Sequence, residues 1–199
     1  HYIASGNYSS SSMFTHLGYT FNELANKTWG IVGMGEIGQK VASIASAFDC
    51  NVQYYSTSGK NNHQAYKQVD FDTLLKTSDI ISIHAPLNKQ TENLFNHDAF
   101  IKMKPSAYLI NVGRGKIVNE KDLVEALKNY QLAGAGLDVF ENEPFNDDSP
   151  LLQINDATKL IMTPHIAWAP VETRNRVIDE VCLNIEGFKN NKLRNVCTL

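Results

Sequence analysis

Cysteine and clustered basic residues are scarce in this 199-residue sequence. The three cysteines, Cys50, Cys182 and Cys197, lie far apart and form no CxxC pair. Zinc ribbons and disulfide frameworks are therefore poor interpretations, no metal site is expected, and a reducing, cytoplasmic compartment fits best. No signal peptide and no apolar run of about 18 residues is visible, so no membrane partner is expected. The net charge of −3, without a basic block, argues against a nucleic-acid partner.

What the sequence does contain is enough apolar material for a packed core. It is 43% hydrophobic and 20% charged, which makes disorder a poor interpretation. Its length predicts one domain, or one domain and a small part of another. The Ser- and Tyr-rich residues 1–23 are interpreted as a connector, with an untidy tail as the open alternative.

From residue 24 onward, short apolar runs alternate with helical patterns. Strands are expected at 29–33, 52–55, 80–84, 108–111, 134–139 and 160–162, and helices at 37–48, 71–75, 96–101, 120–129 and 170–188. Nearly continuous apolar strands indicate a sheet covered on both faces, and strand–helix alternation indicates parallel βαβ units. The prediction is an α/β fold, a Rossmann-type doubly wound parallel sheet with helices on both faces, over residues 24–190.

A glycine-rich turn links the first expected strand to the first expected helix. Gly33, Gly35 and Gly38 have the GxGxxG spacing, and the strand and helix on either side supply the context that a dinucleotide site needs. The first glycine permits the tight turn, the second lets backbone N–H groups approach a pyrophosphate, and the third lets the helix lie close to the strand. The helix N-terminus then faces the anion.

Three later loops carry residues suited to acid–base chemistry. Arg114, Glu143 and His165 each follow an expected strand, so each should lie at the carboxyl edge of the sheet, where open α/β sheets bind ligands. Singly, each has an ordinary explanation as a surface arginine, a solvated glutamate or a loop histidine. Together they place a carboxylate-binding fork, an orienting carboxylate and a proton-transfer group beside a nucleotide site.

These stretches make the chain resemble the NAD-binding domain of the D-isomer-specific 2-hydroxyacid dehydrogenases. The resemblance runs from about residue 24 to 196 and includes MKPSAYLINVGRG at 103–115, GLDVF at 136–140 with Glu143-Pro144, and Thr163-Pro164-His165. It implies a catalytic set of Arg114, Glu143 and His165, an NAD or NADP cofactor, a small 2-keto or D-2-hydroxy acid substrate and a homodimer formed through this domain. The residues implied in cofactor binding are Gly33, Gly35, Glu36, Ile37, Gly38, Ser56, Thr57, Ser58, Lys60, His84, Ala85, Pro86, Thr91, Asn111, Val112, Gly113, Asp138 and Ala167.

Within this family the sequence also departs from the general pattern. No separate substrate domain is present, so these residues should bind cofactor but turn over slowly or not at all alone, and residues 191–199 should return toward that domain. Trp168 favours the glycerate dehydrogenase and hydroxypyruvate or glyoxylate reductase branch, with a D-lactate-type enzyme as an alternative. Glu143 stands where formate dehydrogenases carry glutamine. A cofactor-sensing corepressor-like interaction protein stays an alternative of another class.

Cofactor choice depends on the end of the second expected strand. Family members selective for NAD carry an acid at the position of Ser56, which accepts both ribose hydroxyls and repels a 2′-phosphate. Ser56, Thr57 and Ser58 can donate to a phosphate, and Lys60 adds a positive charge. The expectation is a relaxed choice in which NADP(H) is at least tolerated.

Overall fold

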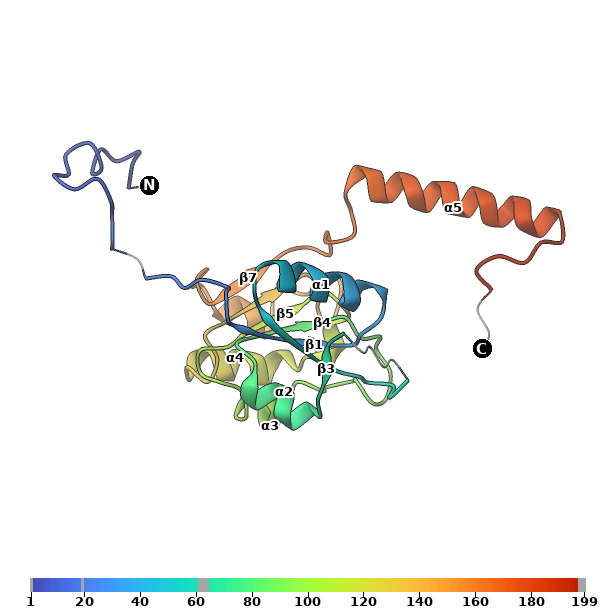
Figure 1. The fold of residues 1–199 in the computed structure, drawn as a ribbon, viewed down its shortest axis with the longest axis horizontal. Coiled ribbons are helices and arrows are strands. Elements are labelled where there is room, and N and C mark those ends of the chain that lie inside the picture. Colours follow the sequence, from blue (N-terminus) through green and yellow to red (C-terminus); the bar gives the residue numbers. More distant parts are fainter. Residues whose placement is uncertain (1, 19, 61–64, 197–199) are drawn as a thin grey trace.

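The computed structural model describes residues 2–18, 20–60 and 65–196. Its centre is a seven-stranded sheet in the order β3-β2-β1-β4-β5-β6-β7, and every pair of neighbouring strands is parallel. This confirms the predicted α/β fold (Figure 1). The predicted connector 1–23 and the predicted tail 191–199 lie partly outside the described residues, and Cys197 lies outside them.

The strands follow the apolar runs of the sequence closely. Their bounds are β1 (Thr28–Val32), β2 (Asn51–Tyr55), β3 (Lys67–Gln68), β4 (Ile80–Ile83), β5 (Tyr108–Asn111), β6 (Gly134–Leu137) and β7 (Leu160–Met162). Strand β3 was not predicted, because it is two exposed polar residues with no apolar signal. Strand β1 pairs with both β2 and β4, so the strand order reverses there, and the carboxyl ends flanking this point form the ligand crevice of such sheets.

Three of the five α-helices in the described part of the chain begin at a capping side chain. Their bounds are α1 (Glu36–Ala47), α2 (Phe71–Thr77), α3 (His97–Phe100), α4 (Glu120–Lys128) and α5 (Val171–Lys189), with 3-10 turns η1 (Gly115–Ile117) and η2 (Pro150–Gln153). Asp70, Asn96 and Asn119 cap α2, α3 and α4 by accepting a backbone N–H of the first turn, which stabilises each start. The two 3-10 turns were not predicted, since they are too short to show a helical period.

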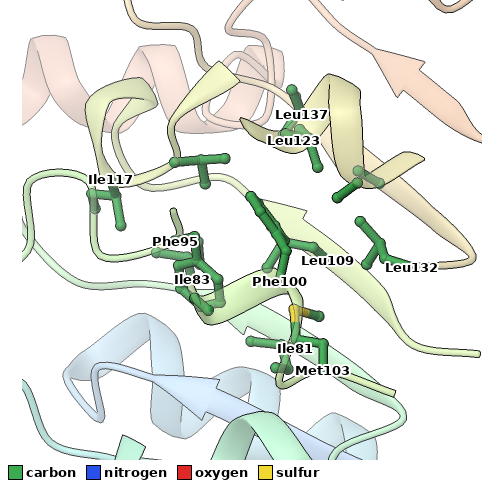
Figure 2. Close-up of a cluster of buried hydrophobic side chains, with 14 of the residues drawn as sticks. Ile81, Ile83, Phe95, Phe100, Met103, Leu109, Ile117, Leu123, Leu132 and Leu137 are labelled. Carbon is green, nitrogen blue, oxygen red and sulfur yellow. The ribbon is translucent and has the colours of Figure 1, made fainter. Parts of the chain in front are cut away.

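Two buried clusters hold helices to opposite faces of the sheet. Ile31, Ala42 and Tyr54 are fully buried between α1 and the sheet. The larger cluster lies on the other face, where α2, α3 and α4 pack, and Phe100 and Leu109 are among its fully buried members (Figures 1 and 2). Strands β5, β6 and β7, whose ends carry the predicted catalytic residues, are held by the larger cluster on one face, whereas the α1 cluster packs on β1 and β2.

Part of the α1 face is not covered by a helix. A hollow of about 600 Å³ lies over β1 and β4–β7, and Phe21, Trp29, Tyr108 and Ile161 are among its lining residues. None of the predicted catalytic residues lines it. Helix α5 extends away from the sheet (Figure 1), and Gly187 is the one buried residue among its 19. No helix among the described residues has the length and apolarity to cross a membrane.

Candidate active site

A histidine and a glutamate from two loops meet at the carboxyl edge of the sheet. His165 follows β7 and Glu143 follows β6, and the distance from His165 Nδ1 to Glu143 Oε2 is 2.6 Å. His165 has φ 53°, a left-handed backbone that costs a non-glycine residue about 1–2 kcal/mol. Its backbone N–H donates to the carbonyls of Asp138 and Thr163 at 2.9 and 3.0 Å, which hold it in that conformation.

The charge of Glu143 sets the orientation of the imidazole. Burial acts to raise the pKa of Glu143, but the Phe140 N–H, the His165 ring and the charge of Arg114 together lower it below its ordinary value. Glu143 is therefore ionised at neutral pH and can only accept hydrogen bonds. The proton between the two side chains must then lie on Nδ1, which leaves Nε2 of His165 free to exchange a proton with a substrate.

Arg114 lies in the loop after β5, and its carbonyl and that of Gly113 are both engaged. The side-chain amide of Asn111 donates to the Arg114 carbonyl at 3.0 Å and accepts the Gly113 N–H at 3.0 Å. Arg114 Nη1 donates to the Gly113 carbonyl at 2.8 Å, and the side chain stays exposed. Asn111 is fully buried, so its amide shapes this loop, whereas Val112 is 37% exposed toward the solvent.

Asp138 holds the His165 loop through both carboxylate oxygens. Oδ1 accepts the Thr163 hydroxyl at 2.6 Å and the Ile166 N–H at 2.9 Å, and Oδ2 accepts the Ala167 N–H at 2.9 Å. Burial acts to raise the pKa of Asp138, yet these donors, with the nearby His165, lower it. The predicted contact of Asp138 and Ala167 with a nicotinamide stays a prediction; in the structure the two residues bond to each other.

The glycine turn between β1 and α1 has the shape that its spacing predicts. Gly33 has φ 93°, and a Cβ there would lie 2.9 Å from the backbone N and Cα of Ala85. A Cβ on Gly38 would lie 2.2 Å from the Gly33 carbonyl oxygen, whereas a Cβ on Gly35 would meet nothing within 4 Å. Gly35 therefore borders open space at the start of α1, toward which the unpaired first-turn N–H groups of Glu36 and Ile37 are available for an anion.

The end of β2 carries a serine with an unused hydroxyl. Ser56 is 8% exposed, and its Oγ has no hydrogen-bond partner among the described residues. Thr57 is half-buried and Ser58 and Lys60 are exposed, with the Lys60 N–H donating to Ser58 Oγ at 3.2 Å. The predicted ribose-end residues thus lie together on one short turn, but the buried Ser56 hydroxyl is less accessible than its neighbours.

The turn after β4 lies directly against the glycine turn. His84 Nε2 is 3.0 Å from Ser82 Oγ, and burial lowers the pKa of His84 to about 4, which keeps the ring neutral. Its Nδ1 is buried and has no partner among the described residues. Thr91 is fully buried and donates to the Pro86 carbonyl at 2.7 Å, so its hydroxyl closes this turn. The cofactor contacts predicted for His84, Ala85, Pro86 and Thr91 stay predictions.

Sequence reasoning missed the contacts that join the loops to one another. Gly115 packs so tightly that a Cβ there would lie 1.8 Å from the Phe140 carbonyl carbon. Glu120 and Glu141 exchange carboxylate-to-backbone hydrogen bonds across the same boundary. The only available signal was position, since Glu120 opens a helix and Glu141 lies two residues before Glu143. Among the residues that the structure describes, no group of three His, Cys, Asp or Glu side chains could hold a metal ion.

Comparison with known proteins shows which family the chain is similar to. Residues 3–167 match the family model of the D-isomer specific 2-hydroxyacid dehydrogenase NAD binding domain. A hydroxypyruvate reductase of Blautia hydrogenotrophica is 39% identical over 189 residues, which cover 94% of this chain and 58% of that protein.

Solved structures agree in fold. An acyclic imino acid reductase in complex with NADPH and D-Arg has a TM-score of 0.85 at 35% identity, covering 98% of this chain and 61% of that one. A D-lactate dehydrogenase with NAD+ from Lactobacillus jensenii has a TM-score of 0.83 at 31% identity, covering 100% and 62%. The chain thus spans less than two thirds of the length of these relatives. It belongs to the D-isomer-specific 2-hydroxyacid dehydrogenase family, whose NAD-binding domain it matches.

Proposed function

We propose that the protein is an oxidoreductase that transfers hydride between a nicotinamide cofactor and a small 2-keto acid or D-2-hydroxy acid. The observation that carries this proposal is the 2.6 Å contact between His165 and Glu143, with the charge of Arg114 close enough to lower the pKa of Glu143. A proton-transfer couple beside an exposed guanidinium fits a substrate that has both a carbonyl and a carboxylate.

Each of the three residues has a distinct role in this proposal. The Arg114 guanidinium binds the substrate carboxylate and polarises the carbonyl oxygen. When bound, the nicotinamide supplies the hydride in reduction and accepts it in oxidation. In reduction His165 donates the Nε2 proton to the forming alkoxide, and Glu143 holds the ring and stabilises its charged form. In oxidation His165 takes the proton from the hydroxyl.

The residues around the β1 turn fit a dinucleotide. A Cβ on Gly35 would meet nothing within 4 Å, so there is space beside this residue for a pyrophosphate. The Glu36 and Ile37 N–H groups lie at the first turn of α1. At the ribose end, Ser56 supplies a hydroxyl that has no hydrogen-bond partner among the described residues, and Lys60 supplies an exposed charge. This set neither repels a 2′-phosphate nor clamps it firmly, which supports the use of both NAD and NADP.

For the substrate we favour the glycerate, hydroxypyruvate and glyoxylate group over lactate. Trp168 is 52% exposed in the loop that carries His165, where it can limit the space for the substrate side chain. The hydroxypyruvate reductase named above supports this choice, whereas the D-lactate dehydrogenase is similar in fold at lower identity. Glu143 stands against a formate dehydrogenase, whose histidine is partnered by glutamine.

The remaining predictions concern the whole protein. We propose that residues 24–190 form the cofactor-binding domain and that 1–23 and 191–199 connect it to a substrate domain. Without that domain, turnover should be slow or absent. Relatives of greater length support this division. The exposed apolar residues of α5, among them Ile178, Val181 and Phe188, support a homodimer. The free thiols of Cys50 and Cys182 support a reducing compartment. Light scattering would contradict the dimer if it gave a 22 kDa species.

A panel of 2-keto acids with NADH and NADPH, run on the full-length protein, tests the function. We expect oxidation of both coenzymes with hydroxypyruvate or glyoxylate, and loss of at least about a hundredfold in rate in His165→Asn, the size of a general acid–base contribution. His97→Asn, at an exposed histidine of α3, is the matched control and should keep full activity. If neither coenzyme is oxidised with any acid, the cofactor-sensing interaction protein becomes the better interpretation.

A further inference from the structure

Two glutamates, Glu120 at the start of α4 and Glu141 in the loop after β6, bind each other's backbone beside the proposed catalytic residues. The Glu120 N–H donates to Glu141 Oε1 at 2.9 Å, and the Glu141 N–H donates to Glu120 Oε1 at 2.7 Å. Glu120 is the first residue of α4, so its N–H is one of the helix donors without an intrahelical partner. Each carboxylate therefore satisfies the backbone of the other residue, as in a capping box that spans 21 positions.

This reciprocal pair ties a catalytic loop to a rigid element. Helix α4 is anchored in the large hydrophobic cluster through Leu123, Val124 and Leu127. Glu120 itself is 6% exposed, and burial, together with the negative charge of Glu141, raises its pKa above the ordinary value. Because the two carboxylates repel each other, the contact cannot owe its value to their mutual attraction. What it provides is a fixed geometry of the two backbones.

The Phe140–Glu141 peptide, which Glu120 holds, also contacts Glu143 and the loop that carries Arg114. Phe140 donates its N–H to Glu143 Oε1 at 2.9 Å, so the carboxylate facing His165 is set by the backbone next to Glu141. On the other side, Gly115 follows Arg114, and a Cβ at Gly115 would lie 2.5 Å from the Glu141 nitrogen. The Arg114 loop therefore packs directly against the Phe140–Glu141 peptide, which belongs to the loop that carries Glu143.

We propose that Glu120 and Glu141 are positioning residues for hydride and proton transfer. They fix the Phe140–Glu141 peptide on α4 and thereby set the separation between Arg114 and the Glu143–His165 couple. The inference rests on the proposed function for its kinetic consequence, but the geometric claim can be measured without turnover.

Four variants test the pair in the protein, with a control on the same helix. Glu120→Ala and Glu141→Ala should each lower kcat for keto-acid reduction by about tenfold or more, since small misplacements of catalytic groups are costly. The Kd for NADH, measured by fluorescence, should stay within about twofold, because the glycine turn is at another strand. Glu120→Gln and Glu141→Gln keep an acceptor oxygen and should restore most of kcat. Glu125→Ala, at an exposed glutamate of α4, should match the unmodified protein.

The double alanine variant adds a second criterion. Each single alanine variant removes one of the two hydrogen bonds and leaves the other, so the double variant should lose more kcat than either single variant. The proposal is wrong if both alanine variants keep kcat within twofold while folded, if the glutamine variants are as slow as the alanine variants, or if kcat and NADH affinity fall together with the melting temperature.

Amide hydrogen exchange separates this inference from the proposed function. In Glu120→Ala the N–H groups of Phe140 and Glu141 should exchange faster, while those of β5 and β6 keep their protection. If the unmodified protein oxidises neither coenzyme, the proposed function fails but faster exchange at these two positions still supports the positioning pair. Unchanged exchange at both positions overturns the pair, whatever the activity.

Discussion

Replacing Gly115 with alanine should lower activity by about a hundredfold or more while the protein still folds. The added Cβ would lie 1.8 Å from both the carbonyl carbon and the oxygen of Phe140. Ordinary van der Waals contact begins at 3.4 Å, so the two backbones must separate by 3.4 − 1.8 = 1.6 Å. Neither partner is a flexible side chain, so the loop that carries Arg114 or the one that carries Glu143 has to move.

The size of this movement sets the expected effect. A displacement of about 1 Å in a catalytic group can cost roughly a hundredfold in rate, so kcat/KM should fall by at least about 100-fold, or ~2.7 kcal/mol. Overpacking a well-packed position costs about 1–3 kcal/mol in folding free energy, which lowers the melting temperature by roughly 2–12 °C in a domain of this size. Affinity for NADH should change little, because the β1 turn is not part of this contact.

Stopped-flow reduction of a keto acid, NADH fluorescence and thermal unfolding together measure these quantities. Gly136→Ala is the matched control, because Gly136 lies in β6 and a Cβ there meets nothing within 4 Å. The reasoning is refuted if Gly115→Ala keeps kcat/KM within about threefold of Gly136→Ala, since the loops could then part without moving Arg114 or Glu143.

Three further substitutions probe the carboxylates and the ribose end. Asp138→Asn replaces one of the two oxygens that accept backbone N–H groups with an NH2 donor. We expect a loss of about 2–3 kcal/mol in unfolding free energy, measured by urea unfolding, and a lower kcat. Glu120→Gln should raise the melting temperature at pH 8 but not below pH 4.5: the raised pKa means that the folded state loses stability as pH rises, and glutamine removes that loss. Equal shifts at both pH values would contradict this. Ser56→Asp should shift the ratio of Kd values toward NADH by about tenfold or more, or 1.4 kcal/mol; an unchanged ratio would exclude Ser56 from the ribose site.

The sequence predicts the sheet well because burial on both faces leaves a strong signal. Six of the seven strands begin within one residue of a predicted apolar run such as Ile80–Ile83, and β1 and α1 follow from the glycine turn between them. Strand β3 left no signal, because Lys67 and Gln68 are exposed polar residues that pair with β2 through backbone groups. The exposed position of α5 could not be predicted either, since its helical period says nothing about what covers it.

The sequence predicts which residues should carry the chemistry, but it does not predict the hydrogen bonds that hold their loops in place. Arg114, Glu143 and His165 are identified by residue type and by their place after strands, and the structure brings Glu143 and His165 into contact. The two supporting networks depend on contacts 21 to 29 residues apart between irregular loops, for which no period or propensity exists. Asp138 shows the difference: its position predicts a site residue, but only its four short contacts show that it holds the His165 loop.

The His165–Glu143 contact is already formed within these residues, which determines how the chain should behave without a second lobe. Glu143, Asp138 and Glu120 have carboxylate oxygens bound to backbone N–H groups, so the His165 loop does not depend on a partner lobe for its shape. What a second lobe would add is substrate binding and exclusion of water. The rate of the 199-residue chain with NADH should therefore rise linearly with keto-acid concentration far beyond the KM of a longer form of the protein. Early saturation at a low kcat would instead mean that the couple itself is out of place, and equal kcat/KM in the two forms would show that no second lobe is needed.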